Sequence, residues 1–417
     1  MSLISPPLSN DLRPYAVVIG LDCITGLQTA RILVHHNVPV LAIARNPNHF
    51  CCKTRVCERI FSADTASEEF IRTLENLGPE LSHKAVLFPC TDMSVLLLSR
   101  NRRRLQDWYH IILPEPDVVE KLMNKISFYT YAEEKGLPIP GTFFLKSKAD
   151  ALKAAKELTF PCILKPPIKT PTWEKNTKAK VFKIADPNEF LAVYDQCSGW
   201  ADILMAQEWI EGTDANLYSC NCYFNKQSEP IVTFIARKLR QWPPETGTSC
   251  LGEECRNDVV LEESIRLFRE VGYCGLGYVE MKQDERTGEY YIIEPNIGRP
   301  TGRSAIAEAG DVELLYSMYC DAVVLPLPAN LQQNYRGVKW IYLRHDFQSA
   351  LHYLRRGDLT LTDWWKSWRG DKAYAVFSWS DPAPFWHDLF RVALLLVNKR
   401  RNKKQPKQVE VSSSILQ

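Results

Sequence analysis

The stretch GLGYVEMKQDERTGEYYIIEPNIGRPTGR, residues 275–303, decides the fold because it predicts a β-hairpin with acidic side chains at matched positions. Apolar runs precede and follow the turn residues DERTG, which is the pattern of two strands joined by a tight turn. Directly opposed residues of such a pair lie about 5 Å apart at Cβ, and a turn centred near Thr287 places Glu280 opposite Glu294. Because side chains alternate faces along a strand, Asn296 shares the face of Glu294.

Two carboxylates at this distance repel each other unless a cation lies between them. Glu280, Glu294 and Asn296 would offer an all-oxygen ligand set, which suits a hard cation. Mg²⁺ is the usual ion where phosphates complete the coordination, and Mn²⁺ is the alternative. An ordinary polar hairpin with solvated acids would also explain these residues from the hairpin alone.

The composition is that of an ordinary soluble globular protein. The chain has 417 residues, of which 45% are hydrophobic and 24% are charged, enough for two to three lobes. A net charge of +2 gives no reason to expect nucleic acid. No secretion signal and no apolar run of about 20 residues is evident, so we expect a cytoplasmic protein. The 13 cysteines are scattered without a CxxC pair, which favours reduced thiols over disulfides or zinc.

The first hundred residues predict an open parallel sheet. Residues 15–19 (YAVVI) and 38–43 (VPVLAI) are typical buried strands, and residues 25–35 between them predict a helix. Residues 84–87 and 111–113 continue the strand series. The fold class is therefore α/β, and this part is expected to form a Rossmann-like lobe.

A dinucleotide site in this lobe is not favoured. The first turn, GLDCITG, lacks the GxGxxG pattern, and the second strand ends without an acid for a ribose hydroxyl. Thr91 and Asp92 follow the strand 86–88, at the edge where open sheets bind ligands, so both are candidate substrate residues. Asp92 is equally well explained as an acid at a helix N-terminus.

The middle of the chain combines a second set of strands with basic residues. A helix is expected at residues 125–136, and the strand 162–165 (CILK) ends in Lys165. Residues 166–180 contain no glycine and four lysines, and we expect a mobile loop there.

Residues 216–224 and 229–237 predict antiparallel strands. The second strand ends with Arg237, Lys238 and Arg240 close together. These cations are either solvated at the strand end or, near the acidic pair, favour a polyanion such as phosphate.

In this order and spacing, the parts resemble the ATP-grasp superfamily of carboxylate–amine ligases over about residues 15–326. The stretches RKLRQWPPETGT, EMKQDERTGEYYIIEPN and FPCTDMSVLLLSR are most similar to the D-aspartate ligase-like branch. The resemblance implies a Rossmann-like lobe at residues 1–115 and an ATP-grasp domain of α+β character at 116–326. Within the latter it implies a lid subdomain at about 142–206, and residues 327–417 remain as a C-terminal extension.

The resemblance also implies roles for individual residues. Lys125 and Lys165 match the two phosphate-side lysines, and Gln207 matches the hinge position that faces the adenine amino group. Asp214 is the expected ribose partner, with Glu211 as competitor. The remaining implied roles are backbone contacts to adenine from Glu208 and Ile210; metal ligation by Glu280, Glu294 and Asn296; catalysis by Arg299, Arg303 and Lys238; phosphate contact by Arg237; and substrate contact by Thr91, Asp92 and Arg240.

One departure concerns the lid. Many relatives cover the triphosphate with a glycine-rich loop, whereas residues 166–180 have no glycine. Side-chain charge would then replace backbone donors, and Lys178 and Lys180 are the candidates.

The implied activity is amide formation between a small carboxylate and an amine, an amino acid being one candidate. ATP and Mg²⁺ drive it through an acyl phosphate, and ADP is released. Two alternatives stay open: an ATP-grasp fold that binds nucleotide without turnover, which the glycine-free lid motivates, and a dinucleotide oxidoreductase, which the missing GxGxxG disfavours. The sequence does not predict the oligomeric state.

The C-terminal extension contains two features of interest. Trp364, Trp365 and Trp368 predict one helix that packs on the preceding lobe. Residues 384–397 are amphipathic to apolar and precede a strongly basic run at 398–407. That segment either docks on the protein or lies peripherally on the inner, anionic face of a membrane.

Overall fold

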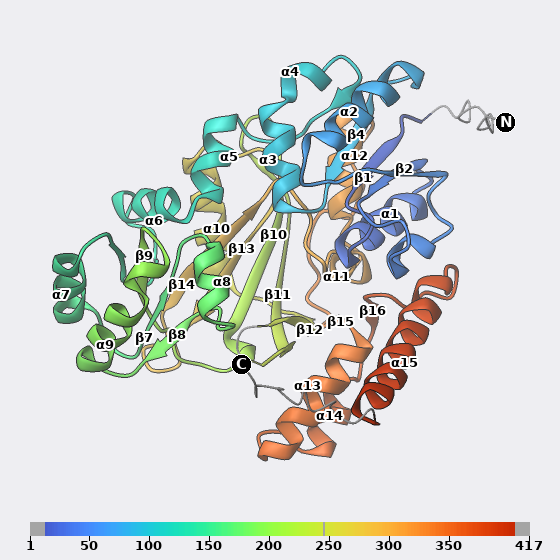
Figure 1. Ribbon diagram of the computed structural model, residues 1–417. Coiled ribbons are helices and arrows are strands. Elements are labelled where there is room, and N and C mark those ends of the chain that lie inside the picture. The colour runs from blue at the N-terminus through green and yellow to red at the C-terminus, as the bar shows by residue number, and fades with distance from the viewer. Residues whose placement is uncertain (1–12, 245–246, 405–417) are drawn as a thin grey trace, which may run out of the picture.

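Three β-sheets organise the computed structural model, which describes residues 13–244 and 247–404 (Figure 1). The first sheet has five parallel strands in the order β3-β2-β1-β4-β5. The strands are β1 (Ala16–Ile19), β2 (Val40–Ala44), β3 (Arg59–Ser62), β4 (Ala85–Pro89) and β5 (Tyr109–His110). Helices α1 (Ile24–His35), α2 (Glu68–Leu77), α3 (Asp92–Arg100) and α4 (Arg102–Leu105) connect them. The expected α/β lobe is confirmed, although the strand expected at 111–113 lies at Tyr109–His110 instead.

The second sheet contains the hairpin. Its seven strands have the order β14-β13-β10-β11-β12-β15-β16. They are β10 (Leu217–Phe224), β11 (Pro230–Trp242), β12 (Thr248–Glu254), β13 (Gly275–Gln283), β14 (Tyr290–Ile297), β15 (Lys339–Ile341) and β16 (Lys372–Tyr374). The antiparallel register of β13 and β14 pairs Glu280 with Glu294, as the hairpin sequence predicts.

The third sheet is small and has its own core. Its strands β6 (Thr142–Leu145), β7 (Cys162–Lys165), β8 (Phe182–Ile184) and β9 (Leu204–Glu208) have the order β6-β9-β7-β8. Helices α7 (Lys148–Glu157) and α9 (Pro187–Cys197) pack with it, and Figure 1 shows this unit at the edge of the molecule beyond α6.

Residues 166–180, the expected lid, contain more secondary structure than the sequence predicts. Part of it forms helix α8 (Pro171–Asn176), capped by the Thr170 hydroxyl. Trp173 is buried beside Phe182 and Trp200, and its indole N–H donates to the Ala179 carbonyl oxygen at 3.1 Å. The expectation of a loop was therefore wrong for residues 171–176, where a helix forms around a buried tryptophan, and the expected mobility stays a prediction.

Two hydrophobic cores join the first sheet to the second. Val17 and Ile19 of β1 enter one core, whereas Ala16 and Val18 enter the other. Each core continues into the seven-stranded sheet, so the two sheets are packed against common interiors. Between and around them lie α5 (Pro116–Met123), α6 (Lys125–Glu134), α10 (Asp258–Glu270), α11 (Ala305–Ala309) and α12 (Leu314–Ala322).

The C-terminal region is tied to the central sheet. It supplies β15 and β16 and the helices α13 (Leu343–Arg356), α14 (Leu361–Ser367) and α15 (Ala383–Lys404). Trp364 and Trp368 donate their indole N–H groups to Asp346, at 3.1 and 2.8 Å, while Trp365 points to solvent. The prediction of one helix that packs through its tryptophans is therefore confirmed only in part. Trp364 packs inward from α14, whereas Trp368 packs inward from just beyond the end of that helix. Within the described residues, no helix is both long and apolar enough to cross a membrane.

Candidate active site

The paired acids of the hairpin each contact a different set of cations. Lys238 Nζ lies 3.5 Å from Glu280 Oε2, and an Arg303 guanidinium nitrogen lies 3.7 Å from Glu280 Oε1. On the neighbouring strand, Lys125 Nζ lies 3.2 Å from Glu294 Oε2. Burial alone would raise the pKa of Glu280, but Lys238 and Arg303 outweigh it and hold that pKa below its ordinary value. Glu280 therefore stays ionised, and a lysine contacts each carboxylate.

Asn296 completes the oxygen set beside these acids. Its side-chain carbonyl oxygen accepts from Arg299 at 2.7 Å, and its buried amide nitrogen has no hydrogen-bond partner among the described residues. A buried polar atom without a partner is destabilising by about 1–3 kcal/mol and is the kind of group that a bound ligand satisfies. Two carboxylates and an amide oxygen fit Mg²⁺ chemically.

Other metal-binding arrangements are not evident. Over residues 13–244 and 247–404, no cluster of three or more His, Cys, Asp or Glu side chains is placed to hold an ion. A cation at the hairpin would therefore need Asn296 and oxygens from a bound ligand to complete its coordination.

Two lysines give the site an excess of positive charge. Lys125 begins α6, where Asn124 caps the helix by accepting from the backbone N–H of Ile126 at 2.9 Å. Lys165 ends β7, and burial together with the charge of Lys125 lowers the pKa of Lys165 to about 8, while Glu294 partly opposes this. An anion placed near both lysines would relieve their repulsion and raise that pKa again.

The β9 residues expected to recognise adenine are mostly engaged in the small sheet. Gln207 is buried and its side-chain amide donates to the Thr142 hydroxyl at 2.9 Å. The Glu208 backbone N–H donates to the Gly141 carbonyl oxygen at 2.9 Å, and its carboxylate accepts from the backbone N–H groups of Gly141 and Thr159. A ligand could thus use the Glu208 carbonyl but not its N–H. Ile210 is buried just beyond the strand.

The two ribose candidates differ in their free capacity. The Asp214 carboxylate accepts three hydrogen bonds, from the Gln241 backbone N–H at 3.2 Å, the Gln241 amide at 2.6 Å and the Tyr353 hydroxyl at 2.7 Å. Among the residues that the structure describes, Glu211 pairs with Lys183 at 4.0 Å. A carboxylate has about four lone-pair sites, so Asp214 retains room for one further donor and Glu211 for more.

A polar cavity of about 280 Å³ lies between these two acids and contains residues that sequence reasoning missed. Trp209 forms part of its wall, and the ammonium groups of Lys183 and Lys282 lie 4.4 and 4.8 Å from the centre of its ring. Burial lowers the pKa of Lys282. The only sequence signal was the tryptophan in QEWIEG, and Tyr353 is too distant along the chain to be linked to it.

Arg299 connects the first lobe to the hairpin. Its guanidinium pairs with Asp92 and donates to the Tyr278 hydroxyl at 3.0 Å as well as to Asn296. Asp92 therefore lies at the site although it also opens α3. Thr91 is the N-cap of α3, where its hydroxyl takes part in a capping box with Ser94.

The three cations of β11 are separated rather than gathered. A β-bulge follows Lys238, and only this residue contacts the acid pair. Arg237 pairs with Glu253 at 3.0 Å. Arg240 is buried against Asp346 at 2.7 Å. The three cations thus have different acid partners and do not converge on one another, and their contacts with phosphate or substrate stay predictions. Lys178 and Lys180 lie on the exposed stretch after α8, and their contact with phosphate stays a prediction.

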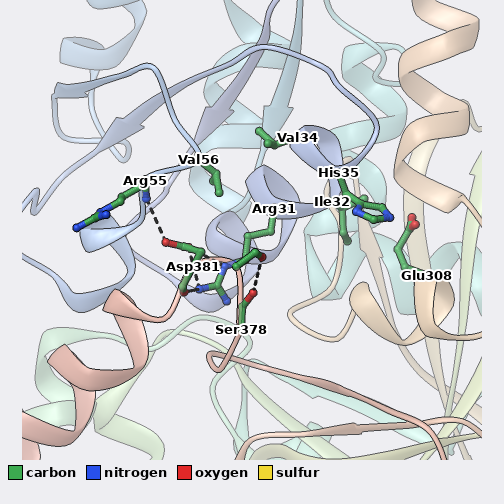
Figure 2. A pocket seen from close by; sticks show the side chains of 10 residues that line it. Arg31, Ile32, Val34, His35, Arg55, Val56, Glu308, Ser378 and Asp381 are labelled. Carbon is green, nitrogen blue, oxygen red and sulfur yellow. Dashed lines mark hydrogen bonds and ion pairs between the residues drawn. The ribbon is translucent and has the colours of Figure 1, made fainter.

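A larger cavity, of about 660 Å³, is lined by residues of α1 and of other segments but by none of the hairpin. Figure 2 shows its lining side chains. Arg31 and Asp381 line it and pair with each other at 2.9 Å. Glu308 at its far side pairs with His36 at 3.2 Å. Both acids that line this cavity are therefore already engaged in ion pairs.

Comparison with known proteins gives consistent relatives. No family model matches the chain. It is 25% identical to a D-aspartate ligase of Enterococcus faecium over 249 residues, which are 57% of this chain and 59% of that protein. It is 22% identical to a D-alanine–D-alanine ligase of Pseudomonas fluorescens over 44% of this chain and 55% of that protein. The matches thus span little more than half the length of these relatives.

Solved structures match over more of the chain. The N5-carboxyaminoimidazole synthetase of Staphylococcus aureus, solved with ADP, superposes with a TM-score of 0.58 at 14% identity. This match covers 79% of this chain and 83% of that one. At such low identity the likeness establishes the fold and nothing further.

Proposed function

We propose that this chain, a member of the ATP-grasp superfamily, is an ATP- and Mg²⁺-dependent ligase that joins a carboxylate to an amine. The observation that carries the proposal is the convergence of Lys125 and Lys165 on Glu294, directly across the strand pair from Glu280. Two acids that share a cation and two lysines that share an anion are what a metal–triphosphate complex requires.

The reaction needs no nucleophilic side chain. A carboxylate oxygen of the first substrate attacks the γ-phosphorus of ATP, which releases ADP and leaves an acyl phosphate. The amine nitrogen then attacks the acyl carbon, phosphate leaves with the bonding pair, and the nitrogen loses a proton to give the amide. Catalysis is then a matter of positioning and charge neutralisation.

The side chains of the site can be given roles in this scheme. Lys125 and Lys165 would hold phosphate oxygens, and Arg299, Arg303 and Lys238 would stabilise the acyl phosphate or the substrate carboxylate. Mg²⁺, held by Glu280, Glu294 and Asn296, would neutralise phosphate charge.

Ligand binding would then exchange the partners of these groups. The acids would leave Lys125 and Lys238 for the cation, and the lysines would turn to the phosphates. Because each ion pair is replaced by another, the exchange leaves no charge unpaired.

We also propose the finer assignments that the sequence predicts. These are the lobes at 1–115, 116–326 and 327–417, and adenine recognition by Gln207, Glu208 and Ile210. Ribose is held at Asp214 or Glu211. An amino acid is proposed as the amine, supported by the similarity to D-aspartate ligase.

ADP release from ATP, Mg²⁺ and a panel of amino acids tests the proposal. Glu294→Gln should abolish release, whereas Glu289→Gln, on the exposed end of the same hairpin, should leave it unchanged. Saturable ATP binding with no release for any substrate pair would favour the non-catalytic nucleotide-binding module. Absence of ATP binding in calorimetry would refute both.

We further propose a location on the inner face of a membrane, with peripheral contact through residues 384–407. The side chains from 396 onward, and all of 405–407, lie outside the described residues. Support comes from the exposed apolar side chains at the start of α15 and from the basic composition of 398–407.

A further inference from the structure

The outward face of α15 is apolar where a helix at a protein surface is usually polar. Trp386 and Phe390 are 62% and 64% exposed, and Leu389 and Leu394 are exposed beside them. Their spacing of three and four residues places them on one face of the helix. The apolar groove lined by Trp386, Leu389 and Phe390 lies on this face. Four large apolar side chains in one exposed stripe indicate a surface that binds something apolar.

The inward face of the same helix carries the charge. Asp388 is buried and accepts hydrogen bonds from Arg344 at 3.1 Å, Arg391 at 2.8 Å and the Tyr342 hydroxyl at 3.3 Å. The Arg391 guanidinium also lies 5.3 Å from the centre of the Phe50 ring. Polar contacts therefore help to fix the helix to the protein, and Phe385 at its start packs against the hydrophobic core beside them.

A second exposed tryptophan belongs to the same surface. Trp379 is 88% exposed and its ring centre lies 4.8 Å from that of Phe377. Phe377 contacts Phe385 at 5.2 Å, and Phe385 contacts Trp386 at 5.4 Å. This aromatic chain couples the two exposed tryptophans, and tryptophan is the residue most typical of the membrane–water interface.

The basic residues that follow these apolar side chains indicate which kind of apolar partner fits the surface. Residues 398–407, NKRRNKKQPK, contain six lysines and arginines and no acid. A second copy of the chain would add a second cationic run and would not neutralise the first, whereas an anionic lipid surface neutralises it.

We infer that α15 and Trp379 bind the surface of an anionic bilayer, with Trp379, Trp386, Phe390 and Leu394 inserted at the level of the headgroups. This identifies the lipid and the inserting residues of the peripheral contact proposed above, and it requires no nucleotide. Figure 1 shows α15 on the opposite side of the molecule from the small sheet β6–β9. Attachment through α15 would thus leave that sheet facing water.

Co-sedimentation of the full chain with vesicles tests the inference. Phosphatidylcholine vesicles containing phosphatidylglycerol should bind the chain, and vesicles of phosphatidylcholine alone should bind it weakly. Bound protein should decrease as salt is raised. Trp386→Ser combined with Phe390→Ser should lower binding by about tenfold or more. Leu394→Ser should lower it less.

Leu152→Ser provides the matched control, because Leu152 on α7 is 45% exposed and Leu394 is 48% exposed. Equal loss in both leucine variants, or equal binding of the double variant and the unchanged chain, would overturn the inference. So would a dimer that the double variant dissociates while no vesicle binds. Since ADP release is measured separately, failure of lipid binding and failure of the ligase proposal are distinguishable.

Discussion

Replacement of Asp346 by alanine should uncouple the C-terminal helices from the central sheet. Asp346 on α13 is fully buried, and one carboxylate oxygen accepts from Arg240 Nε of β11 at 2.7 Å. The other accepts from the indoles of Trp364 and Trp368. Arg240 is itself 5% exposed, so Asp346→Ala leaves a buried guanidinium without its counter-charge.

The magnitude follows from this burial. Removing one partner of a buried ion pair costs about 3–5 kcal/mol because the remaining charge is neither solvated nor paired. Asp346→Asn keeps the shape and one acceptor but also removes the counter-charge of Arg240, so its cost should lie at the lower end of this range. Urea unfolding followed by circular dichroism would measure both values.

Asp358→Ala is the control, because Asp358 pairs with Arg356 at 2.9 Å on the exposed end of α13. An exposed pair contributes about 0–1 kcal/mol, so this variant should unfold almost as the unchanged chain does. A loss below about 1 kcal/mol for Asp346→Ala would refute the reasoning, since the pair would then be solvent-screened.

Three further predictions concern titration and the nucleotide site. The pKa of Lys165 is lowered to about 8, and a bound anion should raise it, so ATP binding at pH 8 should take up protons. Calorimetry in buffers of different ionisation enthalpy would measure this proton uptake, and Lys165→Met should abolish it. Burial lowers the pKa of His345 to about 4, below its value near 6.5 in the unfolded chain. The neutral ring therefore contributes stability above pH 6.5, and this contribution should be lost as the pH falls from 6.5 to 4. In a plot of the free energy of unfolding against pH, His345→Gln should flatten that part of the curve. Tyr353→Phe removes one hydrogen-bond donor to Asp214 and should weaken ATP binding by about 2- to 12-fold, the equivalent of 0.5–1.5 kcal/mol. Unchanged affinity would indicate that Glu211, and not Asp214, contacts the ribose.

Local patterns predicted the hairpin well and the cation cluster poorly. Glu280 and Glu294 could be paired from sequence because a short turn fixes the register of the strands on either side. Arg237, Lys238 and Arg240 could not be placed, since the bulge in β11 and the acid partners of Arg237 and Arg240 depend on β12 and α13.

The helix within residues 166–180 was missed for a related reason. Alternation and turn residues predict strands, but Trp173 packs this helix against Phe182 and Trp200, which the sequence does not place beside it. Likewise, the addition of β15 and β16 to the central sheet is a long-range pairing, which local patterns do not encode.

The charge of the proposed site provides a final argument for its ligand. The side chains that converge there comprise five cations and three anions, an excess of two positive charges when Lys165 is protonated. The cations are Lys125, Lys165, Lys238, Arg299 and Arg303, and the anions are Asp92, Glu280 and Glu294. A complex of Mg²⁺ with ATP carries about two negative charges, so it would neutralise this excess, whereas free Mg²⁺ would increase it. Metal and nucleotide should therefore bind together, and titration of Mg²⁺ without nucleotide should give far weaker binding than titration in the presence of ATP.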